Sequence, residues 1–208
     1  MAPSAQLATL FHYFAQLTPQ QRHQFSQMEP IYTRWNARLN LISRQDISNL
    51  YIRHVLHALS IAKVVSFQPG TRLLDVGTGG GFPGIPLAIL FPQARFHLID
   101  SIAKKVKAVD NIGRELGLSN VTTEVIRAEN ITGKYEFILG RAVKNLIIFH
   151  AWVRHVITPS ARHSIPNGIL YLKGNEPIDP ILPRNTYALH DIFPTLNFFH
   201  DKQLVHVV

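Results

Sequence analysis

The first third of the chain carries a helical pattern of apolar residues. Apolar side chains recur at the spacing of one helix face, first at Leu7, Leu10, Phe11 and Phe14 and again at Ile52, Val55, Leu56 and Leu59. A helix is expected to start at Thr18-Pro19, because threonine caps a helix and proline is tolerated in its first turn. The stretch 35–43 (WNARLNLIS) fits neither the helical nor the strand pattern. Residues 1–65 are therefore predicted to form an N-terminal helical extension.

From residue 66 onward the pattern changes to short strand-like runs that alternate with helical ones. The expected strands are 72–76, 95–99, 121–126, 135–139 and 168–172, and the expected helices are 85–91, 102–116 and 146–157. Such alternation predicts a doubly wound α/β fold with a mostly parallel sheet, here one compact unit over residues 66–208. Two further apolar stretches, 187–193 and 203–208, have no helical pattern between them, so we expect an antiparallel hairpin at the end of the sheet.

A glycine-rich turn follows the first expected strand. It reads DVGTGGGFPG from Asp75 to Gly84, and glycine lets the backbone adopt positive φ and lets a ligand approach closely. Gly79, Gly81 and Gly84 match the GxGxxG pattern of dinucleotide-binding proteins, which alone is a weak signal. Asp75 is more selective, because its carboxylate would repel a pyrophosphate and attract the ammonium of an amino-acid group. S-adenosylmethionine carries that group and NAD does not, so the turn favours S-adenosylmethionine as the cofactor.

Residues at the ends of the next two expected strands fit the rest of such a ligand. Asp100 ends the second strand, where an acid accepts hydrogen bonds from ribose hydroxyls. Ala128-Glu129 follows the third strand, where backbone and side chain could meet the adenine edge. His54 and His57 form an H-x-x-H pair, but a helix surface or the core suits them better, so no metal site is expected.

Composition narrows the class of protein. The chain has 208 residues, 46% hydrophobic and 16% charged, which is typical of one globular domain. It has no cysteine, which excludes disulfides, thiolate metal sites and cysteine nucleophiles and suits a reducing cytoplasm. We see neither an export signal nor an apolar run long enough to span a bilayer, so a cytoplasmic protein without a membrane partner is expected. The net charge of +8 and a pI of about 10.0 favour a polyanionic partner.

Six motifs, in this order, resemble the ribosomal RNA small subunit methyltransferase G family. They are WNARLNLIS (35–43), RHVLHALSI (53–61), LLDVGTGGGFPGIPLAI (73–89), LIDSIAKKVK (98–107), GRAV (140–143) and YLKG (171–174). The GFPGIP continuation of the glycine turn is not shared by methyltransferases at large. The resemblance implies a Rossmann-like class I methyltransferase with a seven-stranded sheet. It also implies methyl transfer from S-adenosylmethionine to N7 of a guanine in 16S ribosomal RNA, near the decoding site.

The glycine turn and the resemblance together give the expected site. The expected cofactor-binding residues are Asp75, Gly77, Thr78, Gly79, Gly81, Phe82, Asp100, Ser101, Ala128, Glu129 and Arg141. Arg141 is also the expected catalytic residue, which contacts the carboxylate of the methyl donor or holds the target nucleotide. Two positions depart from the family pattern: His57-Ala58 stands where many members have Asp-Ser, and Gly140 stands where many have serine.

Basic residues are the expected contacts to RNA. Those expected to bind it are Arg34, Arg38, Arg53, His54 and Lys173, and Lys104, Lys105 and Lys107 are expected to face it in part. Trp35 could stack on a base, but its apolar neighbours favour a place in the core. Guanine N7 has an exposed lone pair, so catalysis needs alignment of the reacting atoms rather than a general base. The expected partner is 16S ribosomal RNA or the small ribosomal subunit, bound by a monomer.

Two other functions stay open at this point. A nicotinamide-dependent oxidoreductase uses the same GxGxxG turn, although Asp75 and the absence of a substrate domain argue against it. The second alternative is a non-catalytic RNA-binding assembly factor with a methyltransferase fold. The intact glycine turn argues against this alternative.

Overall fold

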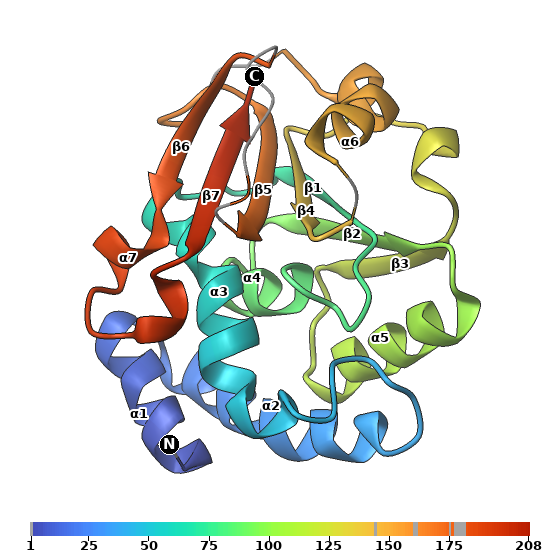
Figure 1. Ribbon diagram of the computed structural model, residues 1–208. Helices are drawn as coiled ribbons and strands as arrows, with labels where there is room; N and C mark the ends of the chain where they lie inside the picture. Colours follow the sequence, from blue (N-terminus) through green and yellow to red (C-terminus); the bar gives the residue numbers. More distant parts are fainter. Residues whose placement is uncertain (1, 144, 160–161, 175, 177–181) are drawn as a thin grey trace.

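A seven-stranded sheet forms the centre of the computed structural model, which describes residues 2–143, 145–159, 162–174, 176 and 182–208 (Figure 1). The strands are β1 (Arg72–Val76), β2 (Arg95–Asp100), β3 (Val121–Val125), β4 (Phe137–Arg141), β5 (Gly168–Gly174), β6 (Arg184–Ala188) and β7 (Lys202–Val207). Their order is β3-β2-β1-β4-β5-β7-β6. β1 to β5 are parallel, and β7 is antiparallel to both β5 and β6. The predicted mostly parallel, doubly wound sheet is confirmed.

Helices cover both faces of this sheet. They are α1 (Pro3–Tyr13), α2 (Pro19–Asn36), α3 (His57–Leu59), α4 (Gly84–Leu90), α5 (Ala103–Glu115), α6 (Leu146–Val153) and α7 (Leu189–Ile192), with a π-helical turn at Leu50–Leu56 before α3. Side chains of a strand point alternately to its two faces. Leu73 accordingly packs in one core cluster with Ile85 of α4, whereas Leu74 packs in a second cluster with Phe149 of α6.

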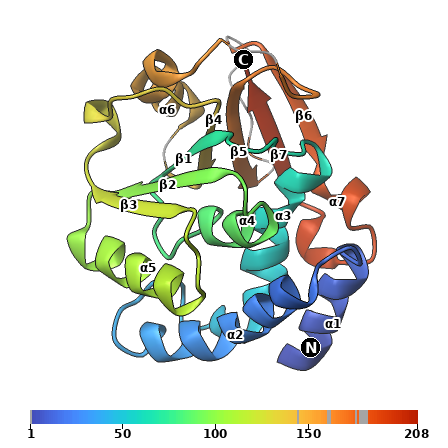
Figure 2. The same cartoon turned by 180° about the vertical axis from the view of Figure 1, so that it is seen from behind.

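The N-terminal helices share the first of these two cores. Thr18 forms a capping box with Gln21 at the start of α2, as Thr18-Pro19 predicted. The core cluster runs without a break from Leu10 of α1 through α2 and α4 to Leu204 of β7. Figures 1 and 2 show α1, α2 and α3 gathered beneath the same side of the sheet as α4 and α5. The helical extension thus covers apolar surface of the sheet domain.

The stretch 35–43, which fitted no simple pattern, is a helix end followed by a turn. α2 ends at Asn36, whose Oδ1 accepts hydrogen bonds from the backbone N–H groups of Leu41 and Ile42. The Trp35 side chain packs partly buried against the core, and its Nε1 donates to Oε1 of Glu115 at 2.9 Å. Trp35 therefore lies at the edge of the core, half-buried, rather than inside it.

The C-terminal region differs from the predicted pair of strands with no helix between them. β6 ends at Ala188, and α7 and a 3-10 turn at Asn197–Phe199 precede β7. Leu189, Phe193 and Phe199 are buried in the main core, so the apolar run after residue 188 belongs to helical turns rather than to a strand. The strand prediction for 189–193 is therefore wrong, while the antiparallel pairing of β6 with β7 is confirmed.

Smaller shifts occur around β4 and α6. β4 begins at Phe137, two residues later than predicted, and Tyr135 forms an isolated bridge to Ile157 instead. The helix predicted at 146–157 ends at Val153 and continues only as a 3-10 turn, Arg154–Val156. In the described part of the chain, no helix combines the length and the apolar character needed to cross a membrane.

Candidate functional site

The turn after β1 brings glycine backbone to the carboxyl edge of the sheet. Gly77, Gly79 and Gly81 have φ values of +66°, +58° and +88°, which residues other than glycine rarely adopt. At Gly84, where α4 starts, a Cβ atom would lie only 2.8 Å from Oδ2 of Asp75. Glycine at these positions therefore allows both the shape of the turn and the close approach of α4 to β1.

Asp75 lies buried beneath this turn. The residue is 1% exposed, and its Oδ2 accepts hydrogen bonds from Oγ1 of Thr78 at 2.7 Å and from the backbone N–H of Gly84 at 2.9 Å. Its Oδ1 has no hydrogen-bond partner. Burial raises the pKa of Asp75 to about 6, although the two hydrogen bonds act in the opposite direction. Asp75 thus fixes the turn with one oxygen and keeps the other unpaired.

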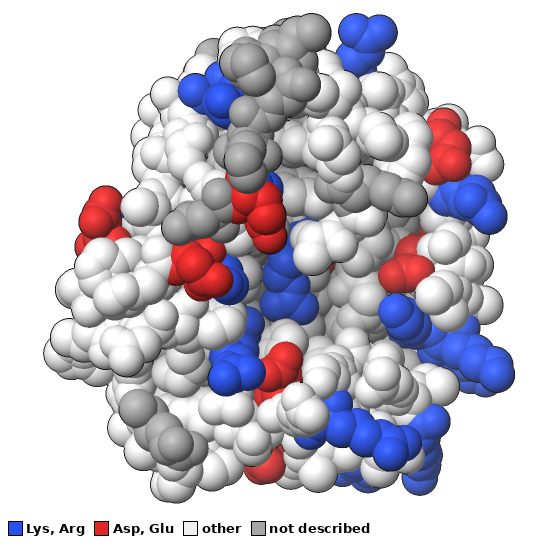
Figure 3. All heavy atoms as spheres, in the orientation of Figure 1, with Lys and Arg blue, Asp and Glu red and all other residues white. Residues whose placement is uncertain are grey.

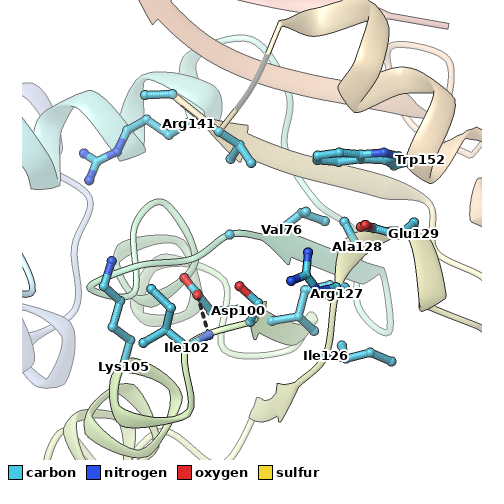
Figure 4. Close-up of a pocket in the computed structure, with 15 residues that line it drawn as sticks. Val76, Asp100, Ile102, Lys105, Ile126, Arg127, Ala128, Glu129, Arg141 and Trp152 are labelled. Atoms are coloured by element: carbon cyan, nitrogen blue, oxygen red, sulfur yellow. Dashed lines mark hydrogen bonds between the residues drawn. The ribbon is translucent and has the colours of Figure 1, made fainter.

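A pocket of about 480 Å³ lies at the carboxyl ends of the parallel strands (Figure 4). The expected cofactor-binding residues that line it are Gly77, Asp100, Ser101, Ala128, Glu129 and Arg141. The others, namely Asp75, Thr78, Gly79, Gly81 and Phe82, are not part of its lining. We call this cavity the strand-end pocket. The structure therefore gathers the expected residues at the strand ends and leaves most of the glycine turn outside the lining.

Asp100 is held by backbone donors on both of its oxygens. Oδ2 accepts from the N–H of Gly79 at 3.0 Å, and Oδ1 accepts from the N–H of Ile102 at 2.9 Å, the bond drawn in Figure 4. Each carboxylate oxygen has a second lone pair for a ligand. Because the residue is 8% exposed and fixed in one orientation, it can accept hydrogen bonds from a ligand without reorganising.

The pocket has apolar walls that the sequence did not reveal. Ile102 follows β2, Ile126 follows β3, and Trp152 extends from α6, and all three line the cavity. Figure 4 shows Ile102 and Ile126 on one side and Trp152 on the other. The strand-end positions of the two isoleucines were a usable signal, whereas Trp152 reaches the pocket only through the packing of α6. Lys105, expected to face RNA in part, also lines the pocket.

Arg141 ends β4 and connects the pocket to a cluster of rings. Its guanidinium carbon lies 5.1 Å from the ring centre of Phe82, which also packs against Tyr32 at 5.1 Å and His54 at 5.3 Å. Burial lowers the pKa of Arg141 to about 10, although Asp75 acts to raise it, so the guanidinium is charged at neutral pH. Among the described residues, no carboxylate lies within ion-pair distance of Arg141.

Comparison with known proteins agrees with this geometry. The family model of rRNA small subunit methyltransferase G matches residues 21–201. The chain belongs to this family. A relative from Flavobacterium psychrophilum named ribosomal RNA small subunit methyltransferase G is 48% identical, over 95% of this chain and 96% of its own length. One from Porphyromonas gingivalis with the same name is 49% identical, over 94% and 90%.

Comparison with solved structures shows the fold of the chain but not its function, because the sequences of those proteins are distant. MtNAS, as a mutant in complex with S-adenosylmethionine, superposes with a TM-score of 0.60 at 12% identity, over 90% of this chain and 76% of that one. A SAM-dependent methyltransferase from Aquifex aeolicus gives a TM-score of 0.51 at 17% identity, over 72% and 88%. The Rossmann-like fold expected from the resemblance is thereby confirmed.

The residues expected to contact RNA lie in three places on this chain. Arg34 forms an ion pair with Glu115, and Arg38 stacks on Trp35, so both face the end of α5. The others lie on the turns before α3 or on β5. Arg53 pairs with Asp46 at 2.6 Å, His54 packs on Phe82, and Lys173 lies 3.3 Å from Glu176.

The two histidines of the H-x-x-H pair, His54 and His57, both lie within electrostatic range of Arg141. His57 is buried, and its Nε2 has no hydrogen-bond partner. Burial holds the pKa of His57 well below its ordinary value, and the charge of Arg141 acts in the same direction. In the part of the chain that the structure describes, no group of three or more His, Cys, Asp or Glu residues is arranged to hold a metal ion.

Proposed function

We propose that this chain transfers the methyl group of S-adenosylmethionine to N7 of a guanine in 16S ribosomal RNA, as a cytoplasmic monomer. Membership of the methyltransferase G family and the names of its relatives support the reaction and the RNA. The strand-end pocket is the observation that carries the proposal, because it lies where α/β sheets of this kind bind nucleotides. The basic net charge of +8 suits an RNA substrate.

The residues of the pocket fit the adenosine part of the donor. Asp100, oriented by two backbone N–H groups, has free lone pairs for the ribose hydroxyls. Ile102 and Ile126 offer apolar surface for a purine ring, and the lining at Ala128-Glu129 offers polar groups to its edge. A nicotinamide dinucleotide would place a pyrophosphate against the turn above the unpaired Oδ1 of Asp75, which is unfavourable.

The amino-acid part of the donor has partners at the other end of the pocket. Gly77 lines it there, and the charged Arg141 lies at the edge of the same lining, where it can hold the target nucleotide. The unpaired Oδ1 of Asp75 lies beneath the same turn and favours a cationic amino group. When bound, S-adenosylmethionine supplies an electrophilic methyl group next to a sulfonium sulfur. The chain has only to hold guanine N7 in line with that carbon, because the N7 lone pair needs no base.

Incubation with labelled donor and small-subunit RNA that lacks the modification tests the proposal. We expect label in 16S RNA, mapped to N7 of one guanine, and comparison of free RNA with the 30S particle identifies the preferred substrate. Label in protein or in a small molecule alone contradicts the RNA assignment. No transfer, together with tight donor binding, points to a non-catalytic RNA-binding factor. Thermal stabilisation by S-adenosylhomocysteine but not by NAD tests the cofactor, and sedimentation tests the monomer.

A further inference from the structure

Buried polar atoms within electrostatic range of Arg141 lack hydrogen-bond partners among the described residues. Both ring nitrogens of His54, Nε2 of His57 and Oδ1 of Asp75 are buried and unpaired. The guanidinium of Arg141, which packs on the same ring, has no ion-pair partner among the described residues. Most buried polar groups in proteins are hydrogen-bonded, so a cluster of exceptions calls for an explanation. Arg141 offers several N–H donors, and the His54 ring, which packs on the same Phe82 ring, offers one acceptor nitrogen when neutral.

His54 is a neutral acceptor in this cluster. Its ring lies 5.3 Å from that of Phe82, and the nearest carboxylate oxygen, Oδ2 of Asp46, is 3.9 Å from Nε2, too far for a hydrogen bond. Oδ1 of the same aspartate is already bound by Arg53. Burial lowers the pKa of His54 to about 3, and the charge of Arg141 acts in the same direction. The imidazole therefore stays neutral across the pH range of an ordinary assay.

Next to His57 lies a group of basic and aromatic side chains, Phe198, Arg53 and Lys202, which we call the rim. The ring of Phe198 lies 5.8 Å from that of His57, and it is flanked by Arg53 at 5.7 Å and Lys202 at 5.2 Å. Figure 3 shows a hollow in this face of the molecule with basic side chains in it and acidic ones near its edge. Cations next to an aromatic ring suit RNA phosphates and bases. The strand-end pocket, on the other side, carries the acids Asp100 and Glu129.

We propose that His54 is a positioning residue for Arg141 on the RNA side of the site. As the acceptor nucleotide enters past the rim, a ring nitrogen of His54 accepts one guanidinium N–H of Arg141. The remaining N–H groups of Arg141 then point at the carbonyl oxygen of the acceptor base. This inference rests on the proposed function, because it assumes that the acceptor is a purine of RNA. An acid in place of His54 would capture the guanidinium in a two-point ion pair, whereas a neutral imidazole leaves it charged and available.

Variants of His54 separate this role from a structural one. We expect His54→Gln to keep activity within about tenfold, because its amide oxygen still accepts a hydrogen bond, and His54→Ala to lose about 100-fold, as for a misplaced catalytic group. His54→Asp should lose at least as much as His54→Ala. The exposed His23→Asp is the matched control with unchanged activity. Single-turnover methylation of small-subunit RNA gives the rates, and titration calorimetry should give donor Kd values within about twofold of the original chain.

A double-mutant cycle with Arg141→Lys decides the mechanism. If His54 acts through Arg141, His54→Ala causes no further loss of rate in the Arg141→Lys background. Losses that multiply overturn the proposal, as does full activity of His54→Ala. A donor Kd that weakens in proportion to the rate places Arg141 on the donor and also overturns it. If the original chain itself does not methylate RNA, the result contradicts the proposed function and not the role of His54. If His54→Asp does not fold, the Ala and Gln variants still give the answer.

Discussion

The strand-end pocket and the cluster around Phe82 treat their polar groups in opposite ways. In the pocket, both oxygens of Asp100 are fixed by backbone N–H groups, so the acid is oriented before a ligand arrives. Around Phe82, the ring nitrogens of His54 are unpaired and Arg141 has no ion-pair partner in the described chain. The difference indicates that the donor half of the proposed site is already oriented in the free protein, whereas the proposed RNA substrate would supply hydrogen bonds to the other half.

The largest effect is expected at the residue that both regions share. Arg141→Ala should lower methyl transfer about 1000-fold, as loss of a charge-stabilising donor does in other enzymes. The fold should survive, because the guanidinium makes a ring contact but no ion pair in the described structure. Single-turnover transfer from labelled donor measures the rate, and thermal unfolding monitors the fold. Full activity in this variant would remove Arg141 from the site.

A substitution at Asp100 tests the strand-end pocket. Asp100→Asn has only one acceptor oxygen for the two N–H groups of Gly79 and Ile102, and it loses the charge that favours ribose hydroxyls. We expect donor Kd to rise roughly 10- to 100-fold, equivalent to about 1.5–3 kcal/mol for a hydrogen bond to a charged group. Calorimetric titration with S-adenosylhomocysteine measures it. Asp110→Asn on α5 is the matched control, and an equal effect there would refute the assignment.

Asp75 tests the charge beneath the glycine turn without breaking the turn. Asp75→Asn keeps an oxygen that can accept from Thr78 and Gly84 but removes the negative charge. Donor affinity should fall about tenfold at pH 7.5. This assumes that the lost attraction between the carboxylate and the donor's ammonium is worth about 1.4 kcal/mol, the free energy equivalent of one pKa unit. Because the pKa of Asp75 is raised to about 6, donor affinity of the original chain should decline as pH falls through 6, and that of the variant should not.

The same pair of proteins gives a stability measurement with a definite sign. The folded chain binds a proton at Asp75 more readily than the unfolded chain, because burial raises its pKa. This contribution is fully present below the pKa of the unfolded chain and is lost as pH rises through about 6. As pH rises from 4.5 to about 7, the melting temperature of the original chain should therefore fall relative to that of the Asp75→Asn variant. A constant difference between the two would show that the carboxyl does not titrate there.

The smallest effect is expected far from both regions. Thr18→Ala removes the side-chain half of the capping box of α2 and should cost about 1 kcal/mol of stability. Methylation and donor affinity should be unchanged at temperatures where the variant is folded. Denaturant unfolding measures the loss. Altered donor affinity would mean that α2 is coupled to the strand-end pocket, and the contrast between the two halves would need revision.

The sequence predicted the site residues whose position depends on the order of strands and helices. It did not predict the contacts between segments that are distant in the chain. Alternating strands and helices place Asp100 at a carboxyl edge whatever the details of packing, and the structure puts it in the pocket. Trp152 could not be found this way, because its place depends on how α6 packs on the sheet. The contact of Arg141 with Phe82 joins β4 to the glycine turn, and no local pattern encodes such a pair. Leu189 was misread as strand because a short apolar run suits either element.

The uninterrupted core beneath the sheet also bears on how this chain can be altered. Leu10, Phe25 and Met28 of the first two helices are buried in the same cluster as Ile85 of α4. A truncated chain that starts at residue 66 would present that apolar layer to water and would aggregate or remain partly unfolded. The N-terminal helices are thus not a detachable RNA-binding appendage, and swapping them between relatives would require the facing side chains of α4 and α5 to be exchanged with them.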